Sequence, residues 1–195
     1  MSLPLKLTFL SKKKILHYWD EIDILVNNAG MANFKAFEDV TQEERGKLMS
    51  LNVDAPFVVT QKLLPALKKR KGNVINIGSY FVNKSLPNRP ASIYAMSKGA
   101  IHTLTKSLAY ELGQYKIRVN AIAPGTTYTP LVENALANMP ERNREIFLNS
   151  IQTIYPLGRL GEVEDISALA LFLASSQAQW ITGAIIHADG GLTTG

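Results

Sequence analysis

Short apolar runs that each end in a polar or glycine-containing cluster recur along this chain, and helical patterns separate them. The four runs are residues 22–27, 73–78, 117–123 and 184–188. Runs of this length bounded by turn residues are typical of buried strands. Strands that alternate with helices favour a parallel sheet, so we expect an α/β fold with a doubly wound parallel sheet flanked by helices.

The segments between these runs carry helix signals. Predicted helices cover residues 41–69, 92–112 and 162–175. Thr41 and Glu44 have the spacing of a capping box at the start of the first helix. Gly113 is placed to cap the end of the second helix. Residues 126–161 show a less regular pattern, and we assign no helix to them.

Composition and cysteine content exclude several kinds of chemistry. The 195 residues are 46% hydrophobic and 19% charged, which is enough to bury one core, so we expect a single domain over residues 1–195. The chain has no cysteine, which excludes disulfides, thiolate metal sites and thiol nucleophiles. The three histidines, His17, His102 and His187, are scattered without ligand spacing, and we expect no metal site.

The net charge of +5 comes largely from two basic runs, residues 12–14 and 68–71. Each run lies at the end of a predicted helix, which favours solvated charge over nucleic-acid binding. No apolar stretch approaches the roughly 20 residues of a membrane span. Residues 3–10 are too short and too interrupted for a signal peptide. We therefore expect a cytoplasmic protein that binds neither nucleic acid nor membrane.

Tyr94 and Lys98 stand four residues apart in the second predicted helix. At this spacing their Cβ atoms lie about 5–6 Å apart on one helix face. A unit charge at about 6 Å and an effective dielectric constant near 20 favours the phenolate by roughly 3 kcal/mol, or about two pKa units. We therefore expect Lys98 to lower the pKa of Tyr94 so that its phenol exchanges protons near neutral pH. Ser79, at a strand end, could hold a substrate oxygen beside it.

The distinctive polar clusters all follow predicted strands. Residues 27–30, Ser79 and residues 124–129 each come directly after an apolar run. In open parallel sheets, ligands bind beyond the carboxyl ends of the strands. One tyrosine–lysine pair alone is a weak signal, whereas three such clusters in one chain predict a common site.

These segments resemble motifs of the short-chain dehydrogenase/reductase family. Asn27-Asn28-Ala29-Gly30 is similar to the family's NNAG turn, and Asn52 is similar to its helix asparagine. Tyr94-x-x-x-Lys98 resembles the family's active-site motif.

The resemblance continues through the C-terminal part of the chain, so that it extends from about residue 22 to residue 191. Pro124-Gly125 with Thr129 resembles the loop on the nicotinamide side. Thr182-Gly183 and Asp189-Gly190-Gly191 resemble the C-terminal signature.

The resemblance implies a Rossmann-like fold and hydride transfer between a nicotinamide cofactor and a carbonyl or alcohol carbon. The implied catalytic residues are Asn52, Ser79, Tyr94 and Lys98. Tyr94 would pass the proton, Ser79 would orient the substrate oxygen, and Lys98 would contact the nicotinamide ribose. Asn52 would hold a water molecule in the proton relay. The hydride chemistry itself belongs to the cofactor.

Cofactor and partners follow from the same resemblance. The implied cofactor-binding residues are Asn28, Ala29, Gly30, Tyr94, Lys98, Pro124, Gly125, Thr127 and Thr129. The cofactor is NAD or NADP. The substrate is a small-molecule alcohol or ketone, and residues 126–155 resemble the mobile substrate lid. A homodimer or homotetramer would form through the helices that begin at Thr41 and Ser92.

Several of these residues also have a structural interpretation. Ser79 could simply end a strand, because its spacing to Tyr94 exceeds the family's by a couple of residues around an insertion at 83–89. Asn52 could be an ordinary interior helix residue, and Thr129 could cap the next helix. The further alternatives are a turn role for Asn27, Asn28 and Gly30, a loop role for Thr126 and Thr127, and a turn role for Asp189. For Ser79 and Asn52 we favour the active-site role.

One large departure concerns the start of the chain. The family begins with a strand, a glycine-rich turn and a helix that hold the cofactor pyrophosphate, yet the sequence contains neither G-x-x-x-G-x-G nor G-x-G-x-x-G. We therefore expect a sheet that lacks the first βαβαβ portion, with one remnant strand over residues 5–9 and a short helix over residues 12–20. The strand at 22–27 then becomes an edge strand.

Two explanations compete. The sequence is part of a longer protein, or it is a short variant that lost nucleotide binding and acts as a catalytically inactive scaffold or oligomerisation partner. We favour the first, because the catalytic quartet is intact and an unsupported sheet edge is costly.

Overall fold

A computed structural model describes residues 20–195 of the chain. Its strands form one parallel sheet in the order β1-β2-β3-β4. The strands are β1 (Ile24–Asn27), β2 (Asn73–Ile77), β3 (Arg118–Pro124) and β4 (Ile185–Ala188). The predicted strand at 5–9, nearly all of the predicted helix at 12–20, the basic run at 12–14 and His17 lie outside the described residues.

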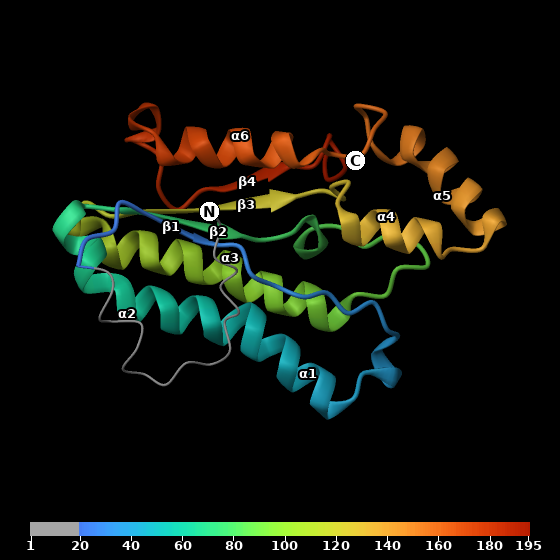
Figure 1. Cartoon of the computed structure of the whole chain (residues 1–195), viewed down its shortest axis with the longest axis horizontal. Coiled ribbons are helices and arrows are strands. Elements are labelled where there is room, and N and C mark those ends of the chain that lie inside the picture. The colour runs from blue at the N-terminus through green and yellow to red at the C-terminus, as the bar shows by residue number, and fades with distance from the viewer. Residues whose placement is uncertain (1–19) are drawn as a thin grey trace, which may run out of the picture.

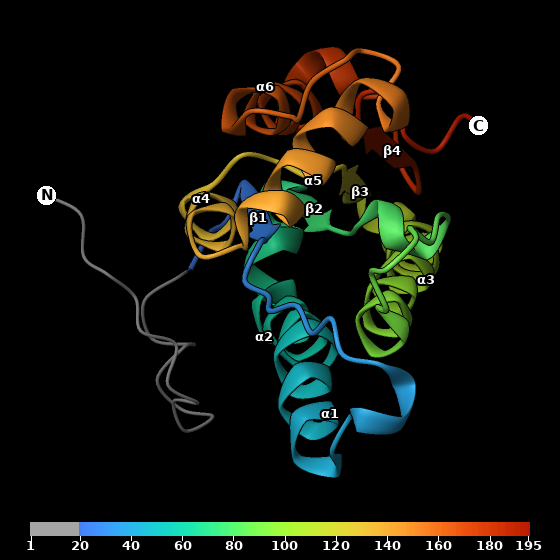
Figure 2. The same ribbon diagram turned by 90° about the vertical axis from the view of Figure 1, so that its right-hand side faces the viewer.

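Helices cover both faces of this sheet. They are α1 (Gln42–Met49), α2 (Ala55–Arg70), α3 (Ser92–Leu112), α4 (Pro130–Ala137), α5 (Glu141–Ile154) and α6 (Val163–Ala174). The helices α2 and α3 lie on one face and α6 lies on the other, while α4 and α5 lie beyond the end toward which the strands point (Figure 1 and Figure 2). The predicted α/β class with a doubly wound parallel sheet is confirmed.

Two helix predictions need correction. The capping box of Thr41 and Glu44 is present, but a π-helical turn at Ser50–Asp54 interrupts the predicted 41–69 helix. Residues 126–161 are largely helical, because Thr129 accepts the N–H of Val132 and starts α4, and α5 follows after a short connection. Gly113 is the C-cap of α3, as predicted, but its backbone is right-handed: the chain continues as a 3-10 turn and reverses at Lys116, whose φ is 60°.

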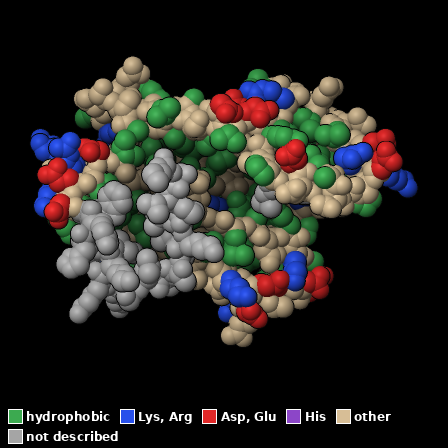
Figure 3. Space-filling view, in the orientation of Figure 1, with side chains coloured by type: hydrophobic (Ala, Val, Ile, Leu, Met, Phe, Trp, Pro, Cys, Tyr) green, Lys and Arg blue, Asp and Glu red, His purple; other side chains and the backbone are tan. Residues whose placement is uncertain are grey.

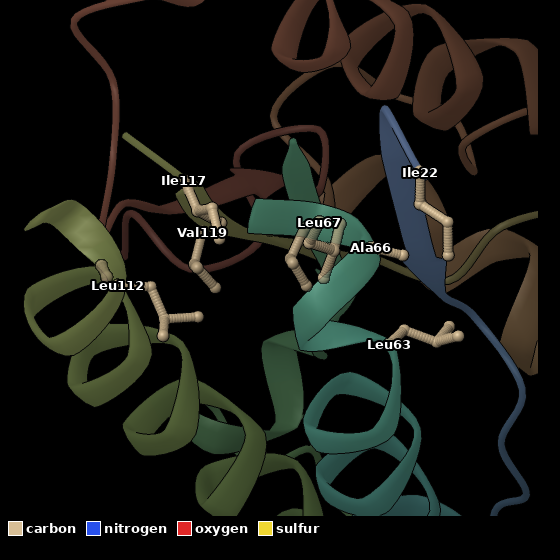
Figure 4. Packing of buried hydrophobic residues seen from close by; sticks show 9 residues of the cluster. Ile22, Leu63, Ala66, Leu67, Leu112, Ile117 and Val119 are labelled. Atoms are coloured by element: carbon tan, nitrogen blue, oxygen red, sulfur yellow. The ribbon is translucent and has the colours of Figure 1, made fainter. Parts of the chain in front are cut away.

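Apolar side chains fill the layers on both sides of the sheet. Between the sheet and the helices α2 and α3 lie Ile22, Leu63, Ala66, Leu67, Leu112, Ile117 and Val119 (Figure 4). On the other face, Ile75 and Ile122 pack against Leu173 of α6. The neighbouring residues Val74 and Ile75 belong to opposite layers, which explains why β2 reads as a continuous apolar run.

Buried amides tie the first two strands to the helices. Asn27 Nδ2 donates to Asn76 Oδ1 at 2.8 Å and to Thr60 Oγ1 at 3.1 Å. Asn76 Nδ2 in turn donates to Thr105 Oγ1 at 2.8 Å. Because unpaired polar groups are costly in a dry interior, this network fixes the register at the end of β1. The structural role considered for Asn27 is therefore present.

The strand β1 is an edge of the sheet within the described residues, where it pairs only with β2. Ile24 and Val26 are each 46% exposed. On the face shown in Figure 3, hydrophobic side chains surround the middle of the molecule and charged side chains gather toward its periphery. Within residues 20–195, no helix combines the length and hydropathy that a bilayer crossing needs.

Candidate active site

A pocket of about 290 Å³ opens at the carboxyl ends of β1, β2 and β3. Asn28 and Gly30 line it after β1, Ser79 lines it after β2, and Gly125 lines it after β3. Tyr94 and Lys98 of α3 line the same pocket, as do Pro124 and Thr127. The polar clusters that the sequence placed at three strand ends therefore converge on one space.

Tyr94 and Ser79 line this pocket together, and the Ser79 side chain acts on the Tyr94 phenol by lowering its pKa. Ser79 is 4% exposed, and its Oγ also accepts the N–H of Phe81 at 3.3 Å, which anchors the serine at the first turn after β2. The tyrosine ring packs edge-on against Phe81 and Phe34, with centroid distances of 5.7 and 5.8 Å. Both side chains are thus held in place where the pocket opens at the end of the sheet.

The prediction that Lys98 lowers the pKa of Tyr94 is wrong. Burial raises the pKa of Tyr94, because a phenolate loses hydration in the pocket, and only the Ser79 hydrogen bond and the charge of Arg89 oppose that rise. Lys98 Nζ lies 5.9 Å from the centre of the tyrosine ring. The helical spacing correctly predicted that the two residues lie on one face of the helix. The predicted pKa shift left out the cost of desolvating the phenolate.

Lys98 is directed at the backbone of β2. Its Nζ donates to the carbonyl of Ile77 at 2.8 Å, and the side chain is almost fully buried. Burial lowers the pKa of Lys98 to about 8. The amine can therefore exchange a proton close to neutral pH, between the strand end and Tyr94.

Asn52 lies in the π-helical turn between α1 and α2 and is buried. Its Oδ1 accepts the N–H of Met31 at 2.9 Å, and its Nδ2 donates to the Met31 carbonyl at 2.8 Å and to Ser97 Oγ at 3.0 Å. Pro56, four residues further on, has no N–H to give to the Asn52 carbonyl. The π turn is a common device at functional sites. The Asn52 side chain therefore connects the loop after β1 to α3, the helix that carries Tyr94.

Two glycines allow close approaches around the pocket. A Cβ at Gly30 would lie 3.3 Å from Asn52 Oδ1 and 3.4 Å from Lys98 Nζ. A Cβ at Gly125 would lie 2.8 Å from the Cα of Asp189, so the loop after β3 runs against the end of β4. Backbone at these positions can come close to a ligand where a side chain would block it.

Two residues of the predicted cofactor set do not line the pocket. Ala29 is exposed and lies in the turn between Asn28 and Gly30. Thr129 Oγ1 accepts the N–H of Val132 at 3.4 Å, so its side chain performs the capping role considered from the sequence. Asn52 also lies behind the pocket wall instead of in it.

Sequence reasoning missed several residues of the pocket wall, among them Phe34, Phe81 and Arg89. The phenylalanines form an aromatic group with Tyr94, and Arg89 reaches over both rings. The signal that could have revealed Arg89 was the stretch Leu86-Pro87-Asn88-Arg89. Its proline–asparagine pair is typical of a turn, but we interpreted this part of the chain only as an insertion.

Comparison with known proteins connects this arrangement to a family. A family model described as "Enoyl-(Acyl carrier protein) reductase" matches residues 11–193. The 3alpha-hydroxysteroid dehydrogenase of Mediterraneibacter gnavus is 45% identical over 170 residues, which is 87% of this chain and 64% of that protein. The chain thus spans somewhat less than two thirds of that relative's length.

Solved structures show the same architecture. Gluconate 5-dehydrogenase from Burkholderia cenocepacia, in complex with NADP and tartrate, has a TM-score of 0.81 and 32% identity and covers 90% of this chain and 66% of its own. A 4-hydroxyisoleucine dehydrogenase complexed with NADH has a TM-score of 0.75 and 30% identity over 89% of this chain and 70% of its own. The chain is a member of the short-chain dehydrogenase/reductase family.

Proposed function

We propose that the protein is an NAD(P)-dependent oxidoreductase that interconverts an alcohol and a carbonyl, with Tyr94 as general acid and base. The observation that carries this proposal is that Tyr94, Ser79 and Lys98 line one pocket at the carboxyl ends of the strands. Members of the family are named as dehydrogenases, which supports oxidoreduction as the class. The two hydroxyls offer a substrate oxygen two hydrogen bonds at one point.

Proton transfer at Tyr94 follows from its environment. Because burial raises the pKa of Tyr94, the phenol and not the phenolate dominates at neutral pH. The phenol is the form that gives a proton to a carbonyl oxygen, so the free protein is set for carbonyl reduction. Ser79, held by the N–H of Phe81, would orient that oxygen and donate the second hydrogen bond.

Replacement of the proton would involve Lys98 and Asn52. The amine of Lys98, with a pKa lowered by burial to about 8, can return a proton toward Tyr94. The Asn52 carbonyl lacks its helical donor at Pro56 and offers an acceptor for a water molecule. Together they would link Tyr94 to solvent on the side away from the substrate.

The described residues fit the nicotinamide end of a dinucleotide. Gly30 leaves backbone open beside Lys98 Nζ, a donor suited to ribose hydroxyls, and Asn28, Pro124, Gly125 and Thr127 line the same space. When bound, the nicotinamide ring supplies or accepts the hydride. NADH and NADP are each found in a solved relative, so both remain in the proposal.

The helices α4 and α5 would cover the substrate. They belong to residues 126–155, and Val132 of α4 already lines the pocket. Phe147 and Ile151 of α5 pack onto the cluster that holds Tyr80 and Phe81. A lid built from these helices would exclude water once a small alcohol or ketone is bound.

We also propose a homodimer or homotetramer formed through α1 and α3. An apolar hollow of about 480 Å³ lies between the start of α1 and the start of α3. Phe37 and Met96 line it and are 81% and 54% exposed. Light scattering should give a multiple of the 21.5 kDa chain mass, and Phe37→Asp should reduce it. A monomeric native protein would contradict this part of the proposal.

Reaction of the purified protein with NADH or NADPH and a panel of carbonyl compounds tests the proposed function. We expect oxidation of the cofactor that depends on the carbonyl compound. A scaffold without nucleotide binding is the alternative, and the absence of a glycine-rich motif from the sequence favours it. Absence of both turnover and cofactor binding, with a folded oligomer retained, would support the scaffold instead.

A further inference from the structure

Arg89 enters the pocket from a turn that the sequence specifies. Pro87 and Asn88 occupy the central positions of the turn Leu86–Arg89, Asn88 has a φ of 57°, and the Arg89 N–H donates to the Leu86 carbonyl at 3.2 Å. Proline followed by an asparagine with positive φ is the signature of a type II turn. Leu86 packs onto the hydrophobic cluster beneath the pocket. The position of Arg89 is therefore built into the loop.

The guanidinium group of Arg89 lies over an aromatic surface with unused donors. It stands 5.1 Å from the ring centre of Phe34 and 5.5 Å from that of Phe81. Its Nη1 reaches Tyr80 Oη and Thr126 Oγ1 only at 3.5 Å each. A guanidinium has five N–H donors, so most of its capacity is left for another acceptor.

Among the residues that the structure describes, no carboxylate forms an ion pair with Arg89. The ion pairs formed among residues 20–195 involve other side chains. Arg89 is partly buried, and it lines the same pocket as Tyr94 and Ser79. Its charge acts on the Tyr94 phenol, opposing the larger effect of burial on the pKa of that group. A cation in a partly desolvated aromatic pocket favours an anionic ligand.

We propose that Arg89 binds a carboxylate of the substrate, so that the preferred substrates are hydroxy acids and the corresponding oxo acids. This rests on the proposed function. The planar guanidinium matches a carboxylate with two parallel hydrogen bonds, while the oxygen that reacts lies at Tyr94 and Ser79.

The reaction is balanced without a further reagent. In the reductive direction the oxo carbon gains a hydride from the reduced nicotinamide, which is thereby oxidised, and the carbonyl oxygen gains the Tyr94 proton. The product is the hydroxy acid, and the proton of Tyr94 is replaced from solvent. The carboxylate on Arg89 keeps its charge throughout.

Matched acids and esters test this assignment. Oxo acids of graded chain length are compared with their methyl esters as substrates of the wild type, Arg89→Met and Arg89→Lys. Methionine keeps an apolar stem over the aromatic rings, and Lys69→Ala, at an exposed position in α2, controls for loss of a positive charge.

We expect wild-type kcat/KM to favour at least one acid over its ester by about 10- to 100-fold, as charge-assisted hydrogen bonds allow. Arg89→Met should remove that preference by raising the KM of the acid, while the ester is still turned over. Arg89→Lys should retain part of that preference, and Lys69→Ala should retain all of it. Equal use of acids and esters by the wild type would overturn the assignment while leaving the proposed function intact.

A binding measurement keeps the assignment testable without turnover. Succinate, glutarate and adipate are compared with their dimethyl esters by ligand-observed NMR on the wild type and Arg89→Met. Binding of a diacid that is lost in Arg89→Met, without binding of its ester, would support the proposal. It would be overturned by binding that Arg89→Met leaves unchanged, by no binding at all, or by Arg89-dependent binding of inorganic phosphate alone.

Discussion

The end of β2 and the end of β1 contribute opposite sides of one pocket, yet they differ in how they are supported. Every residue of β2 from Asn73 to Asn76 is buried, and the strand pairs on both sides. The four residues of β1 alternate between exposed and half-buried, and within residues 20–195 the strand pairs on one side only. Ser79 thus follows a supported strand, whereas Asn28 and Gly30 follow an edge.

This difference separates proton transfer from cofactor binding. Tyr94, Ser79 and Lys98 are held by α3 and the end of β2, which lie in the interior. The loop at Gly30 depends on side-chain hydrogen bonds from Asn27 and on the clasp of Asn52 around Met31. We therefore expect the proton-transfer residues to keep their geometry under changes that disturb the nicotinamide side.

The largest effect is expected at the proton donor. Tyr94→Phe removes the phenolic proton while the ring still packs against Phe81 and Phe34, so turnover should fall by about 10²- to 10⁴-fold or more with cofactor affinity kept. Tyr110→Phe, at a 91% exposed position in the same helix, is the matched control. Near-normal turnover by Tyr94→Phe would remove its assigned role.

The stability of the two strands can be compared directly. Ile75 is fully buried in β2, so Ile75→Ala should lower the free energy of unfolding by about 2–5 kcal/mol. Ile24→Ala, at a half-exposed position in β1, should cost less than about 1 kcal/mol. Urea denaturation measures both. An equally large loss at Ile24 would show that β1 is covered in solution.

An intermediate effect is expected on the nicotinamide side. Gly30→Ala places a Cβ close to Asn52 Oδ1 and Lys98 Nζ, so cofactor affinity should fall by about 10-fold, a change of about 1.4 kcal/mol. Gly46→Ala meets no atom within 4 Å and lies in α1, so it should leave affinity unchanged and slightly stabilise the helix. Calorimetric titration of both variants with the cofactor measures this difference in affinity. Equal affinities of the two variants would contradict the prediction.

A further effect concerns pH and Lys98. Burial lowers the pKa of Lys98 to about 8, against about 10.4 for an exposed lysine. Between about pH 8 and about pH 10.4 the unfolded chain binds more protons at this lysine than the folded chain does. The lysine therefore makes the free energy of unfolding rise with pH over this range, and this stabilisation is lost as pH falls to about 8. The rise should be absent from Lys98→Met and present in Lys69→Met. Parallel pH profiles for wild type and Lys98→Met would contradict it.

The sequence sufficed for the parts of the molecule that local patterns determine. Apolar runs with β-branched residues predicted all four described strands, and strand-end clusters predicted where the pocket opens. The capping box at Thr41 was visible because it depends on residues three apart. The helices α4 and α5 were missed, although Thr129 and Pro130 carry a helix-start signal that was considered only as an alternative.

Features that depend on the folded environment could not be predicted. The direction of the Tyr94 pKa shift follows from burial, which helical spacing alone does not report. The clasp between Asn52 and Met31 joins segments 21 residues apart, and Arg89 meets Thr126 across 37 residues. Contacts of this kind have no periodic signature in the chain.

We propose that one pocket holds a nicotinamide cofactor beside a tyrosine that transfers a proton. Equilibrium titration of the unmodified protein with NADH and NADPH, with Gly30→Ala and Gly46→Ala in parallel, tests it most directly. We predict saturable binding of at least one cofactor, weakened by Gly30→Ala and unaffected by Gly46→Ala. A folded protein that binds neither cofactor would contradict the account.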